Sequence, residues 1–136
     1  MSAEDAVKAI RIKTGSLRRL FRERAMYADE VKMGQEKVAR MKSDASVDLA
    51  DLRQQVRSLS RARRVARSDF FVLSHAENVL EESEMMVKDN ATRVHDAYDS
   101  LAATTEHFEG DAEVTMSEEY KLALELMAEV EEASGK

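Results

Sequence analysis

Apolar residues recur every seven positions through the second half of the chain, and this repeat constrains the fold more than any other feature. A seven-residue repeat lines one face of a helix that packs against another helix. The repeat comprises Leu73, Leu80, Val87, Val94, Leu101 and Phe108, with Ala76, Ser83, Asn90, Ala97 and Thr104 between them. These small and polar intervening residues predict a thin seam between helices. The same phase continues upstream through Ala66, Leu59 and Leu52.

The whole chain has the composition of long helices. It contains no proline and only four glycines, so nothing forces frequent turns. Charged residues make up 35% of the 136 residues and aromatic residues only 5%, which is typical of helices with a wide solvated face. The sequence therefore predicts an all-α protein.

An amphipathic helix is expected over about residues 3–42, because apolar residues recur there at intervals of three and four. They are Ile10, Leu17, Leu20, Tyr27, Val31, Val38 and Met41. A second set, Ile12, Met26 and Met33, lies on a neighbouring face. We expect that face to contact a further helix.

Two more helices follow, over about 69–109 and 116–133. Gly110 and Asp111 predict a turn after the first of them, and Ser134-Gly135 an end to the second. The pattern Thr115-Met116-Ser117-Glu118 predicts a capping box. The simplest architecture is an antiparallel three-helix bundle, up-down-up, with a long helical hairpin and a single domain over residues 1–136.

The segment between residues 43 and 68 has two interpretations. Serine and aspartate pairs at both ends resemble helix caps and indicate a separate helical insertion over about 47–67. Alternatively, the flanking helices both lengthen and the hairpin turns near Ser58-Leu59-Ser60.

Residues that would carry out catalysis are missing. There is no cysteine, and His75, His95 and His107 lack a second histidine three or four residues away, so no metal site is expected. The four glycines stand alone, and none opens a phosphate-binding loop. We expect neither an enzyme nor a bound cofactor.

Charge is unevenly distributed along the chain. Residues 1–68 hold 17 Lys and Arg against 9 Asp and Glu, whereas residues 69–136 hold 4 against 18. Antiparallel pairing of the halves explains this asymmetry, and steering of a partner is the alternative. The basic run from Arg53 to Arg67 could face solvent, bind an acidic protein or bind nucleic acid, but no aromatic residues interleave with it, so nucleic acid is not expected.

No apolar run is long enough to cross a membrane, and the amino end carries acids where a secretory signal would carry bases. We expect a soluble intracellular protein with no membrane partner. The exposed-looking run Phe70-Phe71-Val72 leaves two options open, packing inward or pairing two chains in a homodimer.

Three blocks of residues resemble the tubulin-binding cofactor A family. The first contains Ile10-Arg11-Ile12-Lys13-Thr14-Gly15, Arg19-Leu20, Glu23, Met26-Tyr27, Glu30, Lys32, Gln35-Glu36-Lys37 and Met41. The second runs from Ala76-Glu77 through Glu82-Ser83, Met85-Met86 and Asp89 to Ala97-Tyr98 and Leu101, and the third is Glu118-Glu119-Tyr120-Lys121. Together they cover most of the chain outside its middle.

This resemblance implies a three-helix bundle that captures β-tubulin after its release from the cytosolic chaperonin. The protein would keep β-tubulin from aggregating and pass it to other tubulin-folding cofactors for assembly of the αβ-heterodimer, without nucleotide or metal. A cytoplasmic, cytoskeleton-associated location follows. A generic helical scaffold or coiled-coil adaptor is the alternative function.

The chain departs from the family in two places. Val87-Lys88 stands where the family commonly has a proline, so the helix lacks that cause of a kink. The middle of the chain is longer than the family's hairpin by about three heptads, a length that preserves the phase of the seam.

Candidate contacts with the client come from residues that match the family and are expected to lie off the core. They are Lys13, Thr14, Gly15, Arg19, Glu23, Glu30, Glu118, Glu119 and Lys121. Gly15 suggests either close approach of a neighbouring backbone or a loosened helix, because glycine costs about 1 kcal/mol relative to alanine inside a helix.

Four methionines form a flexible apolar set that either packs in the core or tolerates an incompletely folded client. They are Met26, Met33, Met85 and Met86.

Overall fold

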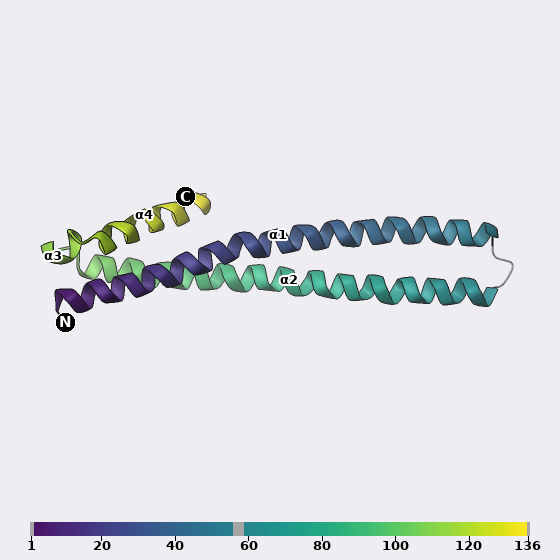
Figure 1. Cartoon of the computed structure of the whole chain (residues 1–136), viewed down its shortest axis with the longest axis horizontal. Coiled ribbons are helices and arrows are strands. Elements are labelled where there is room, and N and C mark those ends of the chain that lie inside the picture. Colours follow the sequence, from purple (N-terminus) through teal and green to yellow (C-terminus); the bar gives the residue numbers. More distant parts are fainter. Residues whose placement is uncertain (1, 56–58, 136) are drawn as a thin grey trace. The chain divides into compact units, whose positions relative to one another are not determined.

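The computed structural model describes the backbone of residues 2–55 and 59–135, and the side chains of residues 2–44 and 70–135. Its elements are α1 (Ala3–Gln55), α2 (Leu59–His107), α3 (Ala112–Thr115) and α4 (Glu118–Ala133) (Figure 1). The expected all-α class is confirmed. α2 runs as one helix through Val87 and Lys88, where the family commonly has a proline.

The separate helix expected over 47–67 is wrong. Residues 47–55 belong to α1 and residues 59–67 to α2, so both helices lengthen, as the alternative interpretation expected. The physical reason is the continuous seven-residue phase, which outweighs the capping preference of isolated serines and aspartates. The turn was expected near Ser58-Leu59-Ser60, but Leu59 and Ser60 already belong to α2. Residues 56–58 lie outside the described residues.

The chain divides into two compact units. Unit 1 comprises residues 1–25 and 88–136, and unit 2 comprises residues 26–87. Each unit contains part of α1 and part of α2. The single domain over residues 1–136 stays a prediction.

Three helices share one core in unit 1. Its fully buried side chains include Ile10 and Leu17 from α1 and Leu101 from α2, while Leu126 and Val130 of α4 are at most 5% exposed. Contacts between Lys13 and Thr104 and between Asn90 and Leu20 show that α1 and α2 are antiparallel here. α4 lies beside the amino-terminal part of α1 (Figure 1), where Glu119 neighbours Arg11 and Glu131 neighbours Phe21, so these two helices are parallel.

Capping at the start of α4 differs from the expected pattern. Ser117, not Thr115, is the N-cap, and its hydroxyl oxygen accepts a hydrogen bond from the Tyr120 backbone amide at 3.2 Å. Thr115 instead closes the short helix α3, which Asp111 caps. At the other end of α4, Gly135 has a φ of 75°, the left-handed conformation that commonly follows a helix, as Ser134-Gly135 predicted.

Unit 2 is a pair of antiparallel helices. Gly34 of α1 meets Leu80 of α2, and Lys42 forms an ion pair with Glu77 at 3.5 Å. Val38 and Ala76 are its buried apolar residues among those described. The described residues of unit 2 belong to α1 and α2, and several of their large apolar side chains are exposed.

Candidate interaction surfaces

Three of the predicted contact residues line one pocket in unit 1. Thr14 and Gly15 of α1 face Glu119 of α4 across a volume of about 190 Å³. Arg11, Arg18 and Leu122 complete the lining. The pocket is therefore a small charged depression between two parallel helices.

Thr14 was expected to lie off the core, and that expectation is wrong. Its side chain is only 7% exposed, and its hydroxyl donates a hydrogen bond to the carbonyl oxygen of Ile10 at 2.7 Å. A threonine can satisfy its hydroxyl in this way one helical turn back and so tolerate burial. The hydroxyl of Thr14 is therefore already bonded within α1 and does not offer a polar group to a partner.

Gly15 lies on an exposed part of α1. A Cβ atom added there would meet no other atom within 4 Å, which rules out close approach of a neighbouring backbone, the first of the two explanations considered for this glycine. α1 continues through this residue without a break. Close packing within the chain therefore does not require a glycine at this position.

The other predicted residues are spread over several faces. Lys13 donates a hydrogen bond to the Thr104 hydroxyl of α2 at 2.6 Å. Glu23 is half-buried, whereas Arg19, Glu118 and Lys121 are exposed. Glu30 lies in unit 2, where it lines a different pocket. The structure therefore brings Thr14, Gly15 and Glu119 together and does not unite all nine residues around one site.

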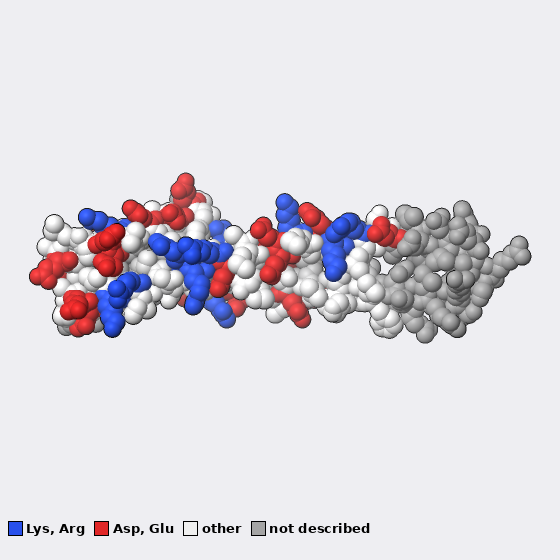
Figure 2. All heavy atoms as spheres, in the orientation of Figure 1, with Lys and Arg blue, Asp and Glu red and all other residues white. Residues whose placement is uncertain are grey.

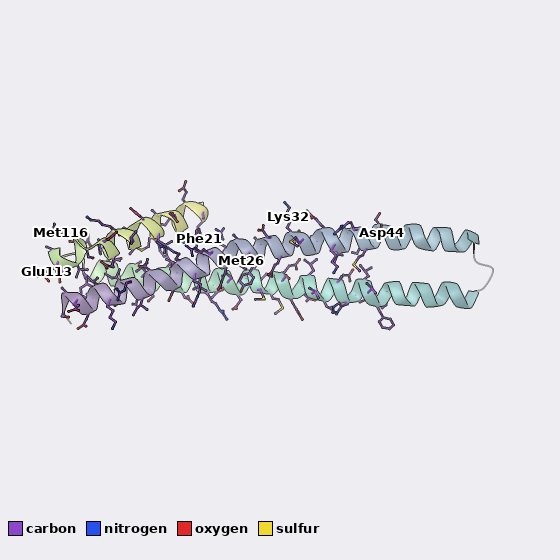
Figure 3. The ribbon with its side chains drawn as sticks, in the orientation of Figure 1. Phe21, Met26, Lys32, Asp44, Glu113 and Met116 are labelled. Atoms are coloured by element: carbon purple, nitrogen blue, oxygen red, sulfur yellow. The ribbon has the colours of Figure 1, made fainter. Side chains whose placement is uncertain are left out.

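Unit 2 exposes a set of large apolar side chains that we call the methionine face. Met33 and Val79 line one pocket of about 490 Å³ between α1 and α2. Met26 lies seven residues before Met33, and Val72 and Met86 lie seven residues on either side of Val79, so they project from the same sides of their helices. The five exposed fractions lie between 45% and 67%. The labelled Met26 marks the start of this face on α1 (Figure 3).

These exposures rule out core packing, one of the two roles considered for the methionines. Met26, Met33, Met85 and Met86 are all exposed, so none of the four packs in the core. Ile12 is also 59% exposed, so the second apolar face of α1 does not contact a further helix, contrary to expectation. The reason is that α4 packs on a different side of α1, the side that carries Arg11, Thr14 and Phe21.

Sequence reasoning named Met86 and Val72 for other reasons but overlooked Val79 and the repeat that links the three residues. Val72, Val79 and Met86 form their own seven-residue repeat, one position ahead of the seam that runs through Leu73 and Leu80. That offset repeat is the signal that could have identified them. A repeat next to a seam places apolar groups at the edge of the helix pair.

Charged residues border this face. Glu30, Glu36, Lys37 and Arg40 line the same pocket as Met33 and Val79. On the face of the molecule seen in Figure 2, acidic and basic side chains alternate over the described residues. The side chains of Arg53 to Arg67, considered as a basic run from the sequence, lie outside the described residues.

Two other kinds of site are not found in the described part of the chain. No three His, Asp or Glu side chains gather there in a way that could hold a metal ion. None of its helices combines the length and the apolar character needed to span a membrane. What these residues do offer is a set of apolar and charged surfaces on helices.

Comparison with known proteins places this architecture in a family. Residues 5–68 match the model of the family described as tubulin binding cofactor A. Tubulin-specific chaperone A of Gallus gallus is 30% identical over 128 residues, which cover 94% of this chain and 95% of that protein. The chain belongs to the tubulin binding cofactor A family. The family resemblance inferred from the sequence is thus confirmed.

Two further relatives agree with this family. Tubulin-specific chaperone A of Mus musculus is 31% identical over 121 residues, covering 89% of each chain. The structure of human tubulin chaperone cofactor A superimposes with a TM-score of 0.61 and 28% identity. That superposition covers 93% of this chain and 98% of the human one, so the resemblance to cofactor A extends over nearly the whole fold.

Proposed function

We propose that this protein is a tubulin-folding cofactor that captures β-tubulin after its release from the chaperonin, stabilises it and passes it on for assembly of the αβ-heterodimer. The observation that carries the proposal is the match to tubulin-specific chaperone A along 94% of the chain. The protein acts by binding and not as an enzyme, and it works in the cytoplasm in association with the cytoskeleton. Other tubulin-folding cofactors are partners in the transfer.

The methionine face gives this role a physical basis. A protein that holds an incompletely folded client needs exposed apolar contacts that adapt to an irregular surface. Methionine is unbranched and polarizable, so it can adjust to different partner shapes. Met26 and Met33 are 59% and 67% exposed, and both are available for such contacts.

Charged residues on the exposed parts of α1 and α4 supply the polar contacts in the proposal. Arg19, Glu118 and Lys121 are exposed, and Glu23 is half-buried. Glu30 borders the methionine face, and Lys13, Gly15 and Glu119 lie next to the pockets between helices. Thr14 contributes through the packing of α1 and not by direct contact.

Co-elution of the purified protein with β-tubulin in size-exclusion chromatography tests the proposal. We expect a complex, together with reduced aggregation of β-tubulin diluted from denaturant. A folded protein that neither co-elutes nor prevents aggregation would support the alternative of a generic helical scaffold.

We propose a homodimer as a second assembly of the free protein. Phe70 and Phe71 are 65% and 64% exposed, and their rings contact each other edge to face at 6.2 Å between centroids. Packing inward is therefore not their role within the chain. Large exposed aromatic groups are typical of interaction surfaces. Sedimentation equilibrium of the free protein tests this, and a monomer at micromolar concentration would contradict it.

A further inference from the structure

The methionine face contains a groove between two helices with apolar side chains on both sides. Met33 of α1 and Val79 of α2 line this groove. Met26 and Met86 lie seven residues away, on the same sides of these helices. Residues seven apart on a helix are separated by about 10.5 Å along its axis. An occupying helix repeats its own side chains over the same interval, whereas an extended strand repeats them about every 7 Å. The spacing of the apolar groups therefore fits an α-helix.

The charges that border the groove change sign along it. Glu30 lines one end, and Lys37 and Arg40 line the other. Glu30 and Lys37 are seven residues apart, so they lie on the same side of α1. Glu36 also lines the pocket, next to Lys37. The order from the α1 residue Met26 onward is thus acidic first and then mainly basic.

We infer that this groove docks one amphipathic α-helix of the client, running antiparallel to α1. The inference rests on the proposed function and names the partner's chemistry. The apolar stripe of the helix covers Met33 and Val79. Basic residues near its carboxyl end lie beside Glu30, and acidic residues near its amino end lie beside Lys37 and Arg40.

The direction follows from the way helices distribute charge. Acidic residues stabilise the amino end of a helix and basic residues its carboxyl end, because of the helix dipole. A client helix built in this way complements the groove only when its basic carboxyl end meets Glu30. Complementary charges of this kind fix orientation more than they raise affinity.

A labelled peptide can report this orientation. The probe is a helical peptide of about 18 residues with an apolar stripe, glutamates near its amino end, lysines near its carboxyl end and a dye at the carboxyl end. Because the chain has no cysteine, single quenchers can be attached through Asp29→Cys or Ser43→Cys. These exposed positions lie about 21 Å apart along α1. We expect stronger quenching from position 29.

Reversing the charges of the groove should reverse the peptide. In the variant Glu30→Lys with Lys37→Glu and Arg40→Glu, we expect stronger quenching from position 43. The matched control is Lys42→Glu with Glu77→Lys, which exchanges an ion pair elsewhere in unit 2 and should leave the quenching pattern unchanged. Equal quenching from both positions, or no response to the groove reversal, would overturn the inferred orientation.

Affinity tests the location of the site. Met33→Glu with Val79→Glu should weaken peptide binding about tenfold or more, since it places charge where apolar groups must be buried. Met85→Glu is the control, because Met85 is 64% exposed but does not line the groove. Circular dichroism should show all variants helical. Unchanged peptide affinity in the Met33/Val79 variant would refute the docking site.

The same variants separate this inference from the proposed function. If β-tubulin binds the wild type and the Met33/Val79 variant equally, the docking inference fails and the proposed function stands. If the peptide docks as described but the wild type does not bind β-tubulin, the proposed function fails and the groove remains a helix-binding site.

Discussion

The side-chain amide of Asn90 on α2 donates a hydrogen bond to the carbonyl oxygen of Leu20 on α1, at a distance of 3.1 Å. Asn90 is only 3% exposed, and its own carbonyl oxygen, Oδ1, is buried without a hydrogen-bond partner. A buried oxygen without a partner lowers stability by about 1 to 3 kcal/mol. A polar residue at a seam position can nevertheless favour one register of helix pairing over others.

Replacing Asn90 by leucine should therefore increase the free energy of unfolding, by about 1 kcal/mol, because it removes the unsatisfied oxygen and fills the seam. Urea denaturation followed by circular dichroism measures the change. Asn90→Ala is the control, because it removes the same polar group but leaves a cavity. Its free energy of unfolding should therefore be lower than that of the leucine variant. A leucine variant less stable than the wild type would show that the hydrogen bond to Leu20 outweighs the unsatisfied oxygen.

The two helical glycines should respond differently to alanine. Gly15→Ala is expected to stabilise the protein by about 1 kcal/mol, because the added Cβ meets open space. At Gly34 the Cβ would lie 3.1 Å from Leu80 Cδ1, so Leu80 must shift and the gain should be smaller. Thermal unfolding compares the two. Equal increases in stability for the two variants would mean that Leu80 can shift at no cost when a Cβ atom is added at Gly34.

Gly15→Ala also separates stability from binding. If Gly15 contacts the client, the alanine variant should be more stable yet bind β-tubulin more weakly. Unchanged binding in a stabilised variant would remove Gly15 from the proposed contacts.

Ser117→Ala should lower the free energy of unfolding by about 1 kcal/mol, because it removes the side chain that caps α4. The matched control is Thr115→Ala. Thr115 donates only a 3.3 Å hydrogen bond to the Ala112 carbonyl oxygen, so its loss should matter less. Chemical denaturation measures the free energy of unfolding of both variants. A larger loss of stability in Thr115→Ala than in Ser117→Ala would support the capping box predicted from the sequence.

Glu131 should control the ionisation of Tyr98. The Tyr98 hydroxyl donates a hydrogen bond to the Glu131 carboxylate, and this bond is the main cause that raises the pKa of Tyr98 above 10.0. Burial and the negative charges of Glu131 and Asp99 add to it. Ultraviolet titration of the Glu131→Gln variant should show the pKa of Tyr98 falling toward its ordinary value. The titration of Tyr98→Phe shows which part of the absorbance change comes from Tyr98.

The same shift has a consequence for stability at high pH. Because the pKa of Tyr98 is higher in the folded chain than in the unfolded one, its stabilising contribution is complete below pH 10.0. That contribution is lost as the pH rises through the folded pKa. Unfolding measured across this range should depend on pH more steeply in the wild type than in Tyr98→Phe, and identical dependence would contradict the assignment.

Much of the fold follows from spacing alone. The repeat from Leu73 to Phe108 predicts the α2 seam, and all of its residues are buried or half-buried. The same repeat, continued upstream, explains why α1 extends to Gln55 and α2 begins at Leu59. The cap at Ser117 could not be chosen over Thr115 from sequence, because both precede a helix-forming run and only the short helix α3 decides between them.

The candidate surfaces were harder to predict. A heptad pattern shows which residues can be buried, but not which side of the helix pair a third helix covers. The outcome depends on where α4 packs: it lies against the Phe21 side of α1 in unit 1, while Ile12 stays exposed. Thr14 was misplaced for a related reason, since a threonine that bonds to its own helix resembles a surface residue in sequence.

The hydrogen bond between Lys13 and Thr104 joins residues 91 positions apart. At about 5 to 20 residues per second, the first turns of α1 are synthesised roughly 5 to 20 s before their α2 partners. Ile10 and Leu17 therefore remain uncovered for most of translation. We expect nascent chains stalled before residue 104 to be cut readily by protease near these residues, and released chains to resist it.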